Sequence, residues 1–132
     1  MKYWGVILIV LVSMIGCGRK QIINIQDEFV PSTTNANQQS LQTVETAILS
    51  ATRKRGWVAR IIRPGLIEAS LTVRSHRAVV EIPYTDKNYS IMYKSSENLD
   101  YSDGTIHRHY NTWVTKLSRT IQDELGVYAQ KY

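Results

Sequence analysis

The sequence predicts an α+β fold, a two-layer sandwich in which a four-stranded antiparallel meander carries two helices on one face. Residues 40–55 and 105–125 carry apolar side chains at helical spacing, whereas the residues between them alternate between apolar and polar. Short turns join the alternating segments, which favours antiparallel neighbours. Two amphipathic helices need a common apolar surface, so both are expected on the same side of the sheet, in the order α-β-β-β-β-α.

The first helix is expected from Ser40 to Arg55. Its apolar positions recur on one side and are Leu41, Val44, Ile48 and Ala51. Asn37 or Ser40 can cap its first turn. The last turn carries cations, which suit the negative end of a helix, and Gly56 follows where a left-handed stop is expected.

Four strands are expected next, at residues 57–63, 67–74, 77–84 and 89–94. Pro64-Gly65 forms the turn between the first two strands. Ser75-His76 makes a tight reversal, and residues 85–88 form a polar hairpin loop. Each strand has one apolar face, so the opposite face of the sheet is expected to stay open to water or to a partner.

The second helix is expected from about Thr105 to Leu125, after a polar loop at residues 95–104. Its apolar face consists of Ile106, Tyr110, Trp113, Leu117, Ile121 and Leu125. Gly126 marks its expected end, and residues 127–132 form a short tail. The folded domain is therefore expected at residues 40–126.

Near the start of the chain lie Lys2, an apolar run at residues 6–15 and the single cysteine, Cys17. This is the layout of an export signal. A membrane-spanning helix is the rival interpretation, but about ten residues span only about 15 Å of a hydrocarbon core of about 30 Å. The sequence therefore predicts a cleaved signal peptide at residues 1–16, and its one cysteine allows no disulfide within the chain.

The residues Met14-Ile15-Gly16-Cys17 resemble the lipobox of bacterial lipoproteins, with methionine in place of the usual leucine. The resemblance implies cleavage before Cys17 and a diacylglycerol on its sulfur. Gly18, where an aspartate favours retention at the inner membrane, implies the outer membrane and a domain that faces the periplasm. We therefore expect a lipoprotein that is held to the membrane through Cys17.

Residues 17–39 are expected to form the lipid anchor and a polar tether. Residues 18–39 are rich in Gln, Asn, Ser and Thr. If fully flexible, they have a mean span of about 25 Å. The alternative is that part of this segment, which contains Ile22, Ile25 and Phe29, docks on the domain in extended form.

Charge is distributed unevenly along the chain, whose formal net charge is +5. Residues 53–77 contain one acid, Glu68, and the bases Arg53, Lys54, Arg55, Arg60, Arg63, Arg74 and Arg77. Such a surface suits an acidic protein, an anionic glycan or lipid phosphate, and nucleic acid is not expected as the partner of an exported protein. We expect Arg60, Arg74 and Arg77 on the open face of the sheet to form the binding surface.

No catalytic motif stands out in the sequence. It contains no G-x-S-x-G elbow, no P-loop and no dinucleotide fingerprint. On a helix His107 and His109 point to nearly opposite sides and cannot share an ion, whereas on a strand they could. We therefore expect no metal site, no cofactor and no enzyme. The alternative is a small envelope hydrolase that uses residues Ser95 to His109.

A further set of residues lies in the second half of the chain: Arg74-Ser75-His76, Tyr89-Ser90-Ile91, Tyr93, Ser95, Asn98-Leu99, Tyr101, Ile106-His107, Tyr110-Asn111 and Trp113. The set is similar to that of a family of small bacterial lipoproteins without an assigned activity, over roughly residues 44–125. The resemblance supports class and location but no mechanism. We expect His107 and Asn111 to hold the Asn98–Tyr101 loop by hydrogen bonds, and the domain to bind an envelope protein or an anionic envelope component.

Overall fold

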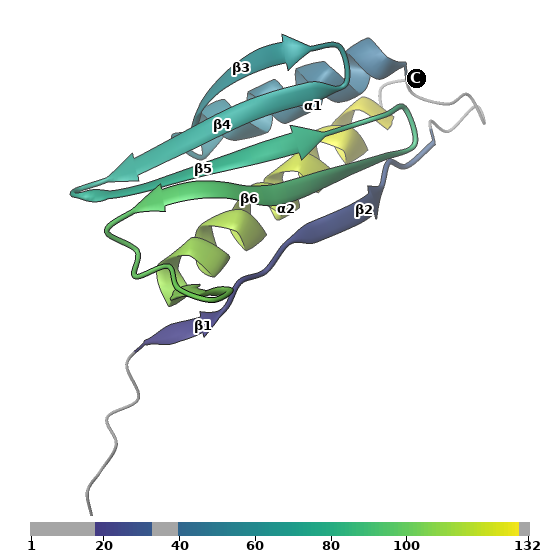
Figure 1. The fold of residues 1–132 in the computed structure, drawn as a ribbon. Helices are drawn as coiled ribbons and strands as arrows, with labels where there is room; N and C mark the ends of the chain where they lie inside the picture. The colour runs from purple at the N-terminus through teal and green to yellow at the C-terminus, as the bar shows by residue number, and fades with distance from the viewer. Residues whose placement is uncertain (1–17, 33–39, 130–132) are drawn as a thin grey trace, which may run out of the picture.

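The computed structural model describes residues 18–32 and 40–129, which form an α+β structure with both helices on one side of a sheet (Figure 1). The helices are α1 (Leu41–Lys54) and α2 (Arg108–Ala129). The expected α+β class is confirmed. The predicted signal peptide at residues 1–16 and the predicted lipidation site Cys17 lie outside the described residues.

The main sheet has five antiparallel strands, in the order β2-β6-β5-β4-β3, and the prediction of four was wrong. The expected meander is present as β3 (Val58–Arg63), β4 (Leu66–Val73), β5 (His76–Pro83) and β6 (Asn88–Glu97). The additional strand, β2 (Ile25–Phe29), comes from the segment expected to be a tether. Pairing with β2 gives hydrogen-bond partners to main-chain N–H and C=O groups of β6 that would otherwise be unpaired at that edge. The alternative of a docked segment is therefore correct for this part of the chain.

A second, two-stranded sheet pairs β1 (Arg19–Gln21) with β7 (Thr105–His107). Residues 105–107, expected to open the second helix, are thus a strand, and α2 begins at Arg108. The helix also continues past Gly126 to Ala129, so residues 127–129 are not a tail. A glycine inside a helix costs only about 1 kcal/mol relative to alanine, and a packed helix tolerates it.

Helix α1 begins and ends as its sequence indicates. Ser40 is the N-cap, and its hydroxyl oxygen accepts a hydrogen bond from the Thr43 amide at 3.1 Å. Gly56 has a φ of +78°, the left-handed conformation expected at the helix stop. The basic residues at this end partly serve the helix pair, because Lys54 forms an ion pair with Glu124 and Arg55 donates to the Thr120 hydroxyl at 2.6 Å.

The core lies between the sheet and the helices, on the face that the alternation predicts. Its strand residues are Ile67, Ala69, Leu71, Ala78, Val80, Ile82, Tyr89 and Ile91. Its helix residues include Val44, Ile48, Ala51, Tyr110, Val114, Leu117 and Ile121. Val79 is a departure, since it is buried although it alternates with the core residues of β5. The reversal before β5 also differs, because His76 is the first residue of the strand and pairs with Val73.

The segment between β1 and β2 is fastened along α2. The Asn111 side chain accepts from the Ile23 amide at 3.0 Å and donates to the Gln21 carbonyl at 2.8 Å. Further along, the Gln122 side chain donates to the Phe29 carbonyl at 3.1 Å. Asn111 therefore holds the N-terminal segment, and the expectation that it holds the 98–101 loop was wrong. The domain includes residues 18–30, ahead of the expected boundary at residue 40.

Candidate functional site

The open face of the sheet carries a charged network that crosses four strands. Glu68 on β4 accepts two hydrogen bonds from Arg60 on β3, at 3.1 and 2.9 Å. Lys94 on β6 lies 2.5 Å from the other oxygen of Glu68 and 3.2 Å from Glu81 on β5. Hydrogen bonds from Lys94 and then Arg60 lower the pKa of Glu68, and Glu68 and Glu81 raise the pKa of Lys94. Arg60 is therefore already engaged by a carboxylate within the protein.

The structure separates the three arginines that were predicted to form one surface. Arg77, near the start of β5, lies 3.7 Å from Glu97. Arg77 is four residues before Glu81 on the same strand, which corresponds to about 13 Å. Arg74 occupies the turn before β5, where its φ is +57°. Among the residues that the structure describes, no ion pair is formed by Arg74. Arg74 and Arg77 thus lie at one end of the sheet, and Arg60 lies within the network on the open face.

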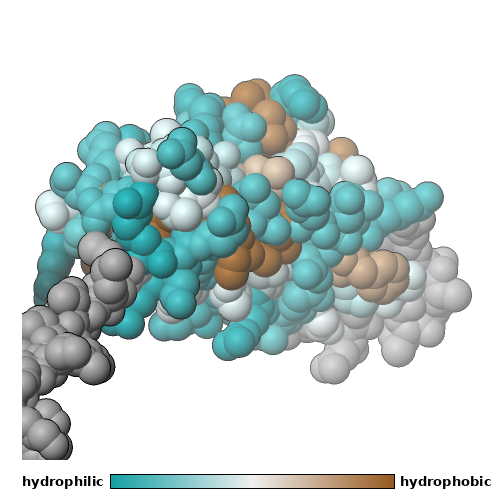
Figure 2. Space-filling view, turned by 60° about the horizontal axis from the view of Figure 1, so that its bottom comes forward, coloured by the Kyte–Doolittle hydropathy of each residue, from teal (hydrophilic) through white to brown (hydrophobic). Residues whose placement is uncertain are grey.

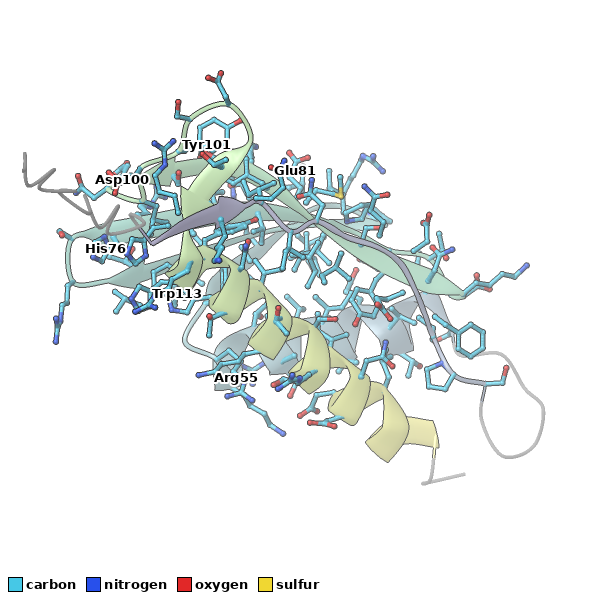
Figure 3. The ribbon with its side chains drawn as sticks, turned by 90° about the horizontal axis from the view of Figure 1, so that it is seen from below. Arg55, His76, Glu81, Asp100, Tyr101 and Trp113 are labelled. Atoms are coloured by element: carbon cyan, nitrogen blue, oxygen red, sulfur yellow. The ribbon has the colours of Figure 1, made fainter. Side chains whose placement is uncertain are left out.

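All three histidines of the chain meet at the end that carries Arg74. The rings of His76 on β5 and His107 on β7 are 6.3 Å apart between centroids, and the rings of His107 and His109 on α2 are 4.6 Å apart and nearly parallel. Trp113 continues the row at 6.1 Å from His109. We call His76, His107, His109 and Trp113 the histidine stack. Figure 3 shows two of its members, His76 and Trp113, at the same end of the molecule.

Main-chain contacts place the first two rings. The Nδ1 of His76 lies 2.6 Å from the Asn98 carbonyl, and the Asn98 side chain donates to the Ser75 carbonyl at 2.8 Å. A carbonyl only accepts, so His76 carries a proton on Nδ1 in this contact. The amide of His107 donates to the Leu99 carbonyl at 2.8 Å. His107 therefore does hold the loop as expected, although it does so through its main chain.

The third ring sits in a less favourable setting for positive charge. The His109 amide donates to Nδ1 of His107 at 3.3 Å, which leaves the proton of neutral His107 on Nε2. Burial, followed by the nearby charges of His107, Arg108 and His76, lowers the pKa of His109. Within residues 18–32 and 40–129, no three His, Cys, Asp or Glu side chains are placed to hold one metal ion. The stack is an aromatic row with titratable members.

A tyrosine cluster lies beside this end. The ring of Tyr93 stacks on Tyr101 at 4.6 Å and meets Tyr110 edge-on at 5.6 Å. The Tyr93 hydroxyl bonds to the Ser96 hydroxyl at 2.9 Å. The buried hydroxyl of Tyr110 has no hydrogen-bond partner among the described residues, and burial raises its pKa. Figure 3 places Tyr101 on the opposite side of the sheet from α2.

The region of the predicted hydrolase alternative does not assemble a nucleophile and a base. In the described part of the chain, no serine hydroxyl bonds to an imidazole nitrogen: Nδ1 of His76 faces a carbonyl and Nδ1 of His107 accepts from an amide. Ser95 and Ser96 belong to β6 and not to the expected loop, and Ser96 pairs with Tyr93.

The opposite end of the sheet contains an open pocket of about 640 Å³. It is lined by residues of the β3–β4 and β5–β6 turns, together with Asp27, Leu41 and Ser90. Tyr84 at its wall donates to Glu45 of α1, and burial with this hydrogen bond raises the pKa of Tyr84 to about 12. This arrangement ties α1 to the end of β5.

On the side of the molecule shown in Figure 2, hydrophobic surface occurs as separate groups among hydrophilic side chains.

One edge of the main sheet is exposed and partly apolar. Among the described residues, β3 is the last strand of the main sheet and pairs with β4 alone. Three of its side chains, Val58, Ile61 and Ile62, are exposed by 75%, 46% and 44%. The register shifts between Ile61 and Arg63, where the strand carries a bulge or irregularity. The predicted meander already implied that this strand would be an edge, but it did not indicate how far the apolar side chains would be exposed.

Comparison of the chain with models of known protein families, with curated proteins and with solved structures found no match. Among the described residues, no helix combines the length and the apolar character needed to cross a membrane. The candidate sites therefore depend on their own geometry, which places an exposed apolar edge at β3 and a row of histidines beside arginines at the start of α2.

Proposed function

We propose that this chain is a lipid-anchored interaction module of the bacterial envelope. It is held at the outer membrane through Cys17, faces the periplasm and binds an extended segment of an envelope protein without transforming it. The observation that carries this proposal is the exposed edge of β3. A partner segment that adds a sixth strand there would bond to its outer main-chain groups and cover its apolar side chains.

Exposure on this edge supports the mode of binding. Val58, Ile61 and Ile62 follow one another along a strand that has one neighbour in the sheet. Exposed apolar edges are hazards that proteins usually remove with charges, bulges or a covering segment. β3 retains three apolar side chains despite its irregular register. An edge of this kind is suited to a strand supplied by another chain.

Charge supports the kind of partner. β3 contains Arg60 and Arg63 and no acidic residue. A second copy paired antiparallel at this edge would bring the arginines of two strands close together, and like charges across a pair of strands are unfavourable. A partner strand with acidic side chains would place carboxylates next to Arg63 and Arg60, of which Arg60 also bonds to Glu68. We therefore infer an acidic extended segment as the occupant.

Photocrosslinking in cells tests the docking edge. A photoreactive residue at Val58 is expected to crosslink a partner, and the same residue at Phe29 on the opposite edge, which is 68% exposed, is not. Ile62→Lys is expected to abolish the crosslink at Val58 while the fold is retained. An unchanged crosslink in Ile62→Lys, equal crosslinking at both edges, or a product of twice the chain mass would each contradict an acidic partner strand at β3.

The anchor is tested separately. Cys17→Ser is expected to release the protein from membranes, because the acyl chains hold it there. The measurement is the share of the protein that sediments with membranes after a salt wash. Mass spectrometry of the natural protein provides the control, since an unprocessed N-terminus or a free thiol at Cys17 would contradict the anchor while leaving the docking edge open to its own test.

A further inference from the structure

We propose that the domain rests against the anionic phospholipid headgroups of the membrane that anchors it, through the end that carries the histidine stack. The contact surface, which we call the anchor end, consists of Arg19, Lys20, Arg74, Arg77, Arg108 and the histidine stack. This inference rests on the proposed lipid at Cys17 for its orientation. The charge of the surface is a property of the described residues alone.

The first step is the point at which the chain joins the domain. Gly18 directly follows Cys17, and its carbonyl accepts from the Arg108 amide at 2.9 Å. In β1 the next residue, Arg19, pairs with His107 in register, and its guanidinium donates to the Thr105 hydroxyl at 2.9 Å. Gly18, to which Cys17 is covalently bonded, is therefore held at the junction of β7 and α2.

The second step is that the chain after Gly18 is bonded to the domain and forms no flexible spacer. The Ile22 amide donates to the Gly104 carbonyl at 2.8 Å, and Asn111 holds the main chain on both sides of Ile22. β2 then joins the main sheet. The expected flexible spacer of about 25 Å is therefore replaced by a segment that is fixed to the domain from residue 18. A lipid at Cys17 would keep the anchor end next to the headgroups.

The third step is charge. The five cations of the anchor end are all exposed. α2 begins there with Arg108 and has no acidic residue in its first turn, so the positive end of its dipole adds to the same field. The acids of this end are Glu97, which faces Arg77 at 3.7 Å, and Asp100 and Asp103 on the loop after β6. Figure 3 shows Asp100 on the opposite side of the sheet from α2.

The fourth step is the role of the histidines. His76, His107 and His109 lie beside the cations of β1, the β4–β5 turn and the start of α2. Histidine is the side chain type that gains positive charge when the pH falls from about 8 to about 5. Acidification adds positive charge to this end. Burial, followed by the charges of His107, Arg108 and His76, lowers the pKa of His109, whereas a nearby anionic surface favours its protonation. Contact with anionic lipid is therefore expected to strengthen as the pH falls.

Vesicle binding tests the surface without the acyl chains. The mature-length chain from residue 17 with Cys17→Ser keeps every described residue. We expect it to sediment with phosphatidylcholine vesicles that contain phosphatidylglycerol, at about 0.1 M salt, and to stay in solution with pure phosphatidylcholine. Because each basic residue near an anionic surface contributes about fivefold in affinity, Lys20→Glu with Arg108→Glu should weaken binding by more than tenfold.

A matched control uses another exposed lysine. Lys87 lies in the β5–β6 turn, at the opposite end of the sheet from the β4–β5 turn. Lys87→Glu changes the net charge by as much as Lys20→Glu and is expected to leave binding within about twofold. Equal losses of binding in Lys20→Glu and Lys87→Glu, each made as a single variant, or equal binding to neutral vesicles, would overturn the proposal. Binding that weakens between about pH 7.5 and 5.5 would also overturn it.

A second measurement uses the lipidated protein itself. A fluorophore on a cysteine introduced in place of Lys20 is expected to be quenched by lipids with a headgroup quencher, and one in place of Lys87 is not. Equal quenching at the two positions would overturn the orientation. If natural Cys17 proves to be unmodified, the anchor fails, but the vesicle comparison still decides whether the anchor end binds anionic lipid.

Discussion

The two edges of the main sheet are treated in opposite ways. On the β2 side, side chains of α2 bond to the main chain of the N-terminal segment. Asn111 bonds to Gln21 and Ile23, which precede β2, and Gln122 bonds to Phe29 at its end. The register of β2 with β6 also shifts between Ile25 and Glu28, where Asp27 has a φ of +52°. Along β3, the described residues provide no neighbouring strand beyond β4, and its apolar side chains remain exposed.

This contrast shows that side chains of a neighbouring helix can secure the segment at a sheet edge. α2 packs beside β2, and two of its amides act as partners for the main chain of the N-terminal segment. No corresponding side chain reaches β3 from the described part of α1. The β2 edge is fastened to the domain by α2, and the β3 edge is available to another chain.

The largest effect on this comparison is expected from Asn111→Ala. The substitution removes two hydrogen bonds and leaves the Ile23 amide without its acceptor, so we expect a loss of about 2 kcal/mol in the free energy of unfolding. Urea denaturation measures the loss, and hydrogen exchange at Ile23 should rise. Thr112→Ala, at the next and exposed position of α2, serves as the control. Equal stability of the two variants would show that α2 does not secure this segment.

The next effect separates two buried tyrosines. The Tyr89 hydroxyl bonds to Ser118 at 2.9 Å and accepts from Gln122, the residue that also holds Phe29. Tyr89→Phe is therefore expected to lower the free energy of unfolding by about 1 kcal/mol. Tyr110→Phe removes a hydroxyl that has no partner among the described residues, so its stability should stay equal or rise. Thermal unfolding of both variants tests this, and the reverse order of stabilities would contradict it.

A smaller effect is expected at the bare edge. Val58→Lys and Ile62→Lys replace exposed side chains and should change the free energy of unfolding by less than about 0.5 kcal/mol. Their expected effect is on association, because a charge on an edge strand disfavours pairing with another strand. Chemical denaturation measures the first quantity and analytical ultracentrifugation the second. A loss of several kcal/mol would show that this edge is covered within the protein.

The smallest effect concerns the pH dependence of the charged network beside β3. Hydrogen bonds from Lys94 and Arg60 hold the pKa of Glu68 below its ordinary value of 4.5. The unfolded chain therefore takes up this proton first, and stability falls as the pH drops from the ordinary pKa through the lowered one. Glu68→Gln should flatten this part of the curve of denaturation midpoint against pH. Glu97→Gln, at an exposed glutamate, is the control, and identical curves for the two variants would contradict the role of the network.

Local patterns predicted the helices, the meander and the core, because alternation and helical spacing report which face of an element is buried. Ser40 and Gly56 fixed the limits of α1 in the same local way. The strands β2 and β7 could not be predicted as such, since short edge strands depend on a partner far along the chain. Ile25 and Phe29 offered a weak signal for β2, which supported docking without its register.

The candidate site was harder to predict for the same reason. His76 and His107 are brought together by the loop that Asn98 supports, and no sequence spacing encodes that contact. The basic stretch was visible in the sequence, but a count of charges does not reveal which are paired. Arg60 is engaged by Glu68 and Arg77 faces Glu97, so the sequence overstated how many free cations one surface offers.

The pairing of β1 with β7 also affects the order in which parts of the chain can fold. In the N-terminal segment, the Ile23 amide bonds to Asn111, 88 residues further on, and the Ile22 amide bonds to Gly104. Contacts between distant parts of a chain are made late, because long loops must close first. The N-terminal part of the described chain, although it is synthesised early, is thus expected to be among the last parts of the domain to be fixed.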